Sequence, residues 1–85
     1  MAARSNDAHV TAHRHSIRNR AELEGSVICG CFYCLSIFPP SEIAEWIDDG
    51  QTAMCPHCPV DSAIGSGSGY PITPEFLKLM HDFWF

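Results

Sequence analysis

The 85-residue sequence has no long hydrophobic run, which excludes a membrane-spanning helix. Its longest mostly apolar stretch, residues 27–40, is interrupted by Gly30, Ser36 and a proline pair, whereas a span needs about 18 apolar residues in succession. The N-terminus carries arginines with no apolar stretch after them, so no signal peptide is predicted. We therefore expect no membrane partner and a cytoplasmic location. In that reducing compartment cysteine pairs are more often metal ligands than disulfides.

Positive charge is scarce outside the N-terminus. Residues 21–85 contain one lysine, Lys78, against nine acidic residues, a net charge of −8. Such an acidic body repels phosphate and excludes a nucleic-acid footprint spread over the whole domain. Residues 1–20 differ, because four arginines against Asp7 give this segment a net charge of +3. Nucleic acid is therefore a possible partner only through residues 1–20.

Five cysteines stand out in a chain this small. A domain of this length buries little more than about 60% of its unfolded surface and gains little stability from its core alone. Four of the cysteines form two Cys-x-x-Cys units, Cys31–Cys34 and Cys55–Cys58, with twenty residues between the units. Zinc binds four thiolates tetrahedrally, and a closed set of four is typical of structural sites. The spacing predicts a structural zinc site, although iron in a rubredoxin-like site would use the same four ligands.

Other candidate ligands fit this pattern less well. Cys29 lies one residue before Gly30-Cys31, a spacing that suits a buried free thiol better than a ligand. His57, inside the second unit, is expected to be an exposed turn residue. His9, His13 and His15 form a cluster in a segment that we expect to be solvated.

The sequence gives little support for an enzyme. Zinc deaminases combine Pro-Cys-x-x-Cys with an upstream His-x-Glu, but here Met54 precedes Cys55 and no His-x-Glu occurs. The remaining catalytic hypothesis depends only on His57, His81 and Asp82 lying near a metal. We therefore predict a non-enzymatic domain.

The remaining pattern predicts a small α+β fold. We expect a flexible basic and histidine-bearing arm at residues 1–15 and a four-cysteine zinc-binding domain at residues 16–85. Short strands at residues 26–31 and 35–38 should flank the first cysteine unit, and another is expected at residues 51–54. About three short helices are expected, at residues 16–24, 41–48 and 75–84. Ile17, Ala21 and Glu24 lie on one face of the first helix. Thr73 is the N-cap of the last helix, and Pro74 occupies its first position.

Two further segments carry expectations. Asp61-Ser62 could cap a single helical turn through Ile64, and residues 65–69 are expected to form a flexible glycine-serine loop. That loop lacks the glycine spacing and the lysine of a phosphate-binding loop, which leaves a small anion nest as its alternative role. The terminal Phe83-Trp84-Phe85 cannot face one side of a helix. These aromatics are either covered by a neighbouring segment or form a contact surface.

The two cysteine units resemble those of the zinc-ribbon and treble-clef group of four-cysteine zinc fingers. Members of that group bind nucleic acid or proteins, or use zinc only as a core. Residues 15–85 also resemble short uncharacterised bacterial cytoplasmic proteins, a resemblance that implies no activity. It is carried by the string Cys31-x-x-Cys34…Phe38-x-Pro40-x-Glu42-Ile43-x-x-Trp46…Cys55-Pro56-x-Cys58…Asp61-Ser62…Gly69-Tyr70-Pro71-Ile72-Thr73.

The hypothesis that follows is a zinc-stabilised module that binds a protein partner or a second copy of itself. Its basis is the acidic body, the surplus of aromatic residues at the C-terminus and the lack of an assembled acid–base pair. The alternative is a nucleic-acid-binding zinc finger that uses the basic N-terminal segment.

Overall fold

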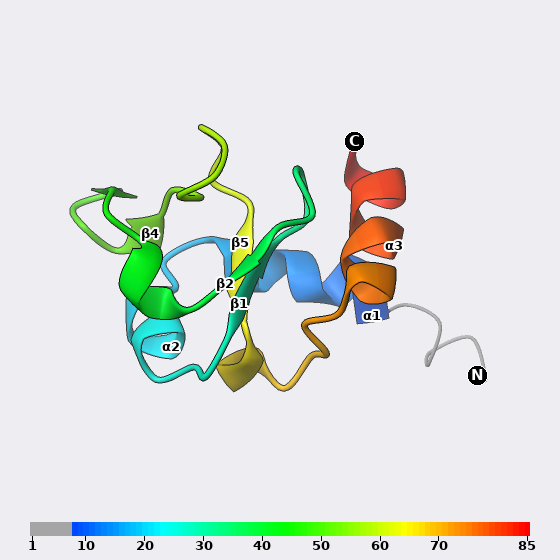
Figure 1. Ribbon diagram of the computed structural model, residues 1–85, viewed down its shortest axis with the longest axis horizontal. Coiled ribbons are helices and arrows are strands. Elements are labelled where there is room, and N and C mark those ends of the chain that lie inside the picture. The colour runs from blue at the N-terminus through cyan, green and yellow to red at the C-terminus, as the bar shows by residue number, and fades with distance from the viewer. Residues whose placement is uncertain (1–7) are drawn as a thin grey trace.

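The computed structural model describes residues 8–85, which form a small α+β domain, as the sequence predicts (Figure 1). Three α-helices, three 3₁₀ helices and five short strands make up this part of the chain. The helices are α1 (Ala8–Thr11), η2 (Ala12–Ser16), α2 (Arg20–Glu24), η3 (Pro40–Glu42), η4 (Ser66–Ser68) and α3 (Pro74–Trp84). The strands are β1 (Cys29–Cys31), β2 (Ile37–Phe38), β3 (Trp46–Ile47), β4 (Thr52–Ala53) and β5 (Ala63–Gly65).

A three-stranded antiparallel sheet of order β2-β1-β5 forms the centre of the domain. Gly30 pairs with Ile37 on one side and with Ile64 on the other. The strands that were expected around the first cysteine unit are thus confirmed. Gly30 also lets α3 approach the sheet, because a Cβ atom there would lie 2.7 Å from Cδ1 of Leu77.

The predicted helix over residues 41–48 is wrong. Only η3 forms, and the chain then enters a hairpin in which Trp46 pairs with Ala53 and Ile47 with Thr52. The connecting Asp48, Asp49 and Gly50 have φ values of +55°, +60° and +79°. Three successive left-handed residues cannot continue a right-handed helix, and aspartate and glycine are among the residues that tolerate this conformation. The strand predicted over residues 51–54 is present as β4.

Residues 61–69 also differ from expectation. No helical turn follows Asp61-Ser62, because Ala63, Ile64 and Gly65 form β5 against β1. The glycine-serine segment is tied to the domain: the Ser66 hydroxyl accepts hydrogen bonds from the Val27 and Ile28 amides. The Gly67 amide in turn donates to the Ser26 hydroxyl. This amide of the segment is therefore not free to bind an anion.

The N-terminal segment is helical and packed where the described residues begin. Helices α1 and η2 contact α3 and β5, and Ala12 is fully buried between them. The sequence predicted an arm through residue 15; residues 1–7 of that arm lie outside the described residues. Ala12 and the partly buried Ala8 pack into this core, and the rings of His9 and His13 contact Phe83 and Trp84 of α3.

Helix α2 is shorter than the helix predicted over residues 16–24. The face on which Ile17, Ala21 and Glu24 were expected to lie together is exposed to solvent. Helix α2 begins at Arg20, and Ile17, Ala21 and Glu24 are exposed, whereas Leu23 and Asn19 are buried. The Asn19 amide nitrogen donates to the carbonyl oxygens of His15 and Ala63, and its oxygen accepts from the Ala53 amide. This one side chain therefore joins η2, β4 and β5.

The last helix agrees with its prediction. Thr73 accepts a hydrogen bond from the Phe76 amide as N-cap, and Pro74 occupies the first position. Phe76, Leu77 and Met80 are buried in a cluster that also contains Ala12, Phe32 and Ile64. A second cluster contains the metal-ligand candidates Cys31 and Cys55. No helix in residues 8–85 is long and apolar enough to cross a membrane.

Candidate metal centre

The first cysteine unit is a tight turn between β1 and β2. Cys31 ends β1, and the amides of Tyr33 and Cys34 donate hydrogen bonds to its sulfur at 3.3 and 3.5 Å. Leu35, with φ +65°, reverses the chain, and its amide donates to the Cys31 carbonyl at 2.8 Å. Two intervening residues are the spacing that lets one such turn direct both sulfurs to the same side.

The second cysteine unit repeats part of this geometry after β4. The His57 amide donates to the Cys55 sulfur at 3.3 Å, the same relation that Tyr33 has to Cys31. The Cys55 amide donates to the Val60 carbonyl at 3.0 Å and closes the loop. Strand β5 then returns to β1, so the sheet brings the second unit beside the first.

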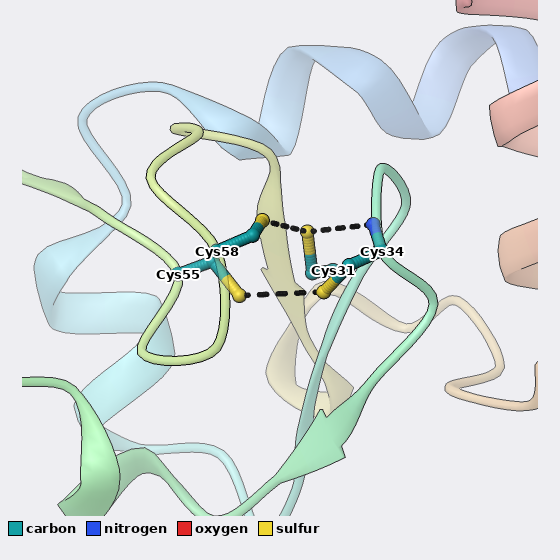
Figure 2. A group of neighbouring side chains, drawn as sticks. All are labelled: Cys31, Cys34, Cys55 and Cys58. Atoms are coloured by element: carbon teal, nitrogen blue, oxygen red, sulfur yellow. Dashed lines mark hydrogen bonds between the residues drawn. The ribbon is translucent and has the colours of Figure 1, made fainter.

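The four sulfur atoms point toward one another (Figure 2). All lie within 4.8 Å of one another, with 3.6 Å between Cys31 and Cys58 and 3.7 Å between Cys34 and Cys55. A tetrahedron with metal–sulfur bonds of ~2.3 Å has sulfur–sulfur edges of ~3.8 Å. The structure therefore brings all four predicted ligand residues together in a cluster that could hold a metal ion.

The four thiols of the cluster ionise with different ease. Burial raises the pKa of the Cys31 thiol, and the neighbouring Cys55 charge raises it further. Burial and the adjacent Cys31 and Cys34 thiols raise the pKa of Cys58. At Cys34 burial is outweighed by hydrogen bonds from the Ser36 hydroxyl and amide, which lower its pKa to about 7. A divalent cation would remove the repulsion between thiolates that opposes their ionisation.

Two serines beside the sulfurs were missed by sequence reasoning. The Ser62 hydroxyl lies 3.0 Å from the Cys31 sulfur and is buried, and the Ser36 hydroxyl lies 3.0 Å from the Cys34 sulfur. Partners that hydrogen-bond a ligand fix its orientation and adjust its charge. Ser36 could be suspected because it follows Cys34 by two residues. Ser62 is brought to Cys31 only by the pairing of β1 with β5. The sequence near Ser62 therefore contains no pattern that would predict this contact.

Cys29 is not one of the four cysteines whose sulfur atoms converge, as predicted. It is fully buried in the sheet, and burial raises the pKa of its thiol to about 11. At neutral pH this thiol is protonated and shielded, which makes it a weak nucleophile.

Cys29 is accordingly expected to resist alkylation in the folded protein. When metal-loaded protein is treated with iodoacetamide at pH 8, mass spectrometry should find Cys29 unmodified, and the same treatment in 6 M guanidinium should modify it fully. Modification of Cys29 in the folded state at the rate of a free cysteine would contradict its shielded position. Free cysteine in the same tube is the reference.

The histidines do not join the cluster; in the part of the chain that the structure describes, the four cysteines are the one group that could hold a metal. His57 is exposed, as expected, and donates to the Glu42 carboxylate at 2.9 Å. The N-terminal histidines make separate contacts: His9 with the Phe83 ring, His13 stacked on Trp84 at 3.9 Å, and His15 with the Glu22 carboxylate.

The three residues of the catalytic hypothesis have separate partners. His57 contacts Glu42, His81 contacts the Phe32 carbonyl, and Asp82 pairs with Lys78.

In comparisons with protein-family models, curated proteins and solved structures, no match to this chain was found.

Proposed function

We propose that the protein is a zinc-stabilised, non-enzymatic domain of a reducing compartment, the cytoplasm, that binds a protein partner through α3. The convergence of four cysteine sulfurs carries the zinc part of the proposal. Four protein thiolates complete a tetrahedral coordination sphere and leave no position for water or substrate, which is the arrangement of structural zinc sites. Metal analysis by mass spectrometry tests it: one zinc per chain is expected, whereas stoichiometric iron would make the site rubredoxin-like.

The exposed side of α3 supports a binding role. Leu79 and Phe83 lie one helical turn apart, and 52% and 54% of their surfaces are exposed. Pro74, Glu75, Lys78 and Leu79 line a shallow hollow on the same helix. Exposed apolar side chains that gather on one element are typical of protein contact surfaces. We assign Leu79 and Phe83 to that contact.

Replacing Leu79 and Phe83 with alanine is expected to abolish partner capture or self-association while the zinc content stays at one per chain. Both side chains are about half exposed, and the ring contacts that the double variant gives up are those of Phe83 with His9 and Trp84, so the fold should lose little stability. Pull-down from a nuclease-treated lysate and sedimentation of the purified protein measure the two kinds of association. Trp84→Ala is less suitable, because the Trp84 indole donates to the His9 carbonyl and stacks on His13.

A matched control is Val27→Ala, outside α3. The Val27 side chain is 86% exposed, so this variant also truncates an exposed apolar side chain and should leave association and zinc content unchanged. Association that survives the double alanine variant unchanged would reject the assigned contact.

Binding of nucleic acid by the basic N-terminal segment is the second candidate. Arg14 and Arg18 are exposed, which favours it, whereas Arg20 is held by Glu24 and the Gly50 carbonyl and lies 4.5 Å above the Trp46 ring. Contacts between arginine and phosphate release counterions, so binding should fall steeply with added salt. A variant with Arg14 and Arg18 changed to alanine that binds nucleic acid equally well would reject this candidate.

A further inference from the structure

The first cysteine unit is connected to α3 through both residues between its cysteines. The Phe32 side chain is buried in the cluster formed with Ala12, Leu77 and Met80, although it lies between two candidate metal ligands. Its backbone is held as well: the Phe32 amide donates to the Ser62 carbonyl at 3.0 Å. The turn that carries Cys31 and Cys34 therefore packs into the same hydrophobic cluster as η2 and α3.

His81, on the last turn of α3, contacts this turn directly. Its Nδ1 lies 3.2 Å from the Phe32 carbonyl oxygen. A carbonyl only accepts hydrogen bonds, so Nδ1 is the donor. The next residue of the turn, Tyr33, has ring contacts with His81 and, edge to face at 4.8 Å, with Phe85.

The second unit differs, because the residues between its cysteines are not part of the core cluster formed with α3. Its intervening residues, Pro56 and His57, are exposed, and His57 contacts Glu42 and the Phe38 ring. The first unit is thus the one whose intervening residues contact α3.

We propose that the last turn of α3, with His81 as a positioning residue, holds the first cysteine unit in its metal-binding conformation, so that metal affinity and docking of α3 are coupled. The inference rests on the proposed metal centre. A turn already held in place loses less conformational freedom when two of its side chains bind a metal. By linkage, metal binding strengthens docking of α3 by the same factor. A partner that competes for His81 or Phe85 would therefore weaken metal binding, and one that leaves these contacts intact would not.

The test measures metal affinity and metal geometry in the full chain. Zinc affinity is obtained by competition with a chromophoric chelator, and the visible bands of the cobalt-substituted protein report the coordination geometry. His81→Ala is expected to lower zinc affinity about tenfold, the smallest loss typical of removing a group that fixes the orientation of metal ligands. His81→Asn, whose amide can donate to the same carbonyl, should recover most of that loss. A purely packing role would not produce this recovery.

Two further variants keep the result interpretable. Phe85→Ala removes the contact with Tyr33 at an exposed terminal residue and should also lower affinity, even if His81→Ala fails to fold. Lys78→Ala, on the same helix without contact to the first unit, should match the wild type. Equal zinc affinity in the wild type, His81→Ala and Phe85→Ala overturns the coupling alone. A wild-type protein that shows no cobalt–thiolate bands overturns the metal centre and the coupling together.

Discussion

Replacing Cys55 with serine, or Cys34 with serine, is expected to leave the protein unfolded or aggregated even when zinc is supplied. Structural zinc sites contribute roughly 10–16 kcal/mol in finger peptides, which is as much as the whole stability of a typical domain. Each substitution removes one of the four sulfurs that converge in the cluster. Circular dichroism and one-dimensional NMR should show loss of the native fold, and the zinc content should fall below one per chain.

Removal of zinc from the wild type with a strong chelator should have the same effect, and added zinc should reverse it. The matched control is Cys29→Ala, which removes the cysteine that lies outside the cluster and should retain one zinc per chain. A chelated protein that still unfolds cooperatively would show that the apolar core suffices, against the structural role of the metal.

Replacing Asn19 with alanine should have a large effect on stability, although Asn19 is not one of the four clustered cysteines. The substitution leaves two carbonyl oxygens and one amide without partners at a buried position, because Asn19 is only 2% exposed. An unpaired buried polar group costs about 1–3 kcal/mol, so we expect a loss of about 3 kcal/mol or more. Urea unfolding of the zinc-loaded protein measures the change.

Gln51→Ala is a suitable control for Asn19, since it removes an exposed amide and should change stability by no more than about 0.5 kcal/mol. If Asn19→Ala unfolds at the same urea concentration as the wild type, the three hydrogen bonds do not hold η2, β4 and β5 together.

The parts of the fold that could be predicted are those with a strong local cause. Two Cys-x-x-Cys units identified all four cysteines of the cluster, and Thr73-Pro74 marked the start of α3. The helix expected at residues 41–48 had a plausible apolar spacing in Ile43, Trp46 and Ile47. The left-handed backbone conformation of Asp48 and Asp49 is incompatible with that helix. In a sequence, aspartate indicates this conformation less clearly than glycine does.

The surroundings of the site depended on contacts between distant residues. Ser62 reaches Cys31, and His81 reaches Phe32, over separations of 31 and 49 residues. No periodicity or spacing encodes such pairs, because each arises only once the sheet and α3 have formed. The histidines of the N-terminal segment were likewise interpreted as solvated, since ring contacts with Phe83 and Trp84 become visible only when α1 lies beside α3.

The contact between α1 and α3 has a consequence for the order of events during synthesis. Helices α1 and η2 are separated from α3 by most of the chain, yet Ala12 of η2 lies in one cluster with Leu77 and Met80, and Ala8 of α1 packs against it. During translation the strands and both cysteine units are synthesised before residues 74–84. The N-terminal helices can contact β5 before then but lack their contacts with α3, so this half of the molecule is completed only after α3 has been translated.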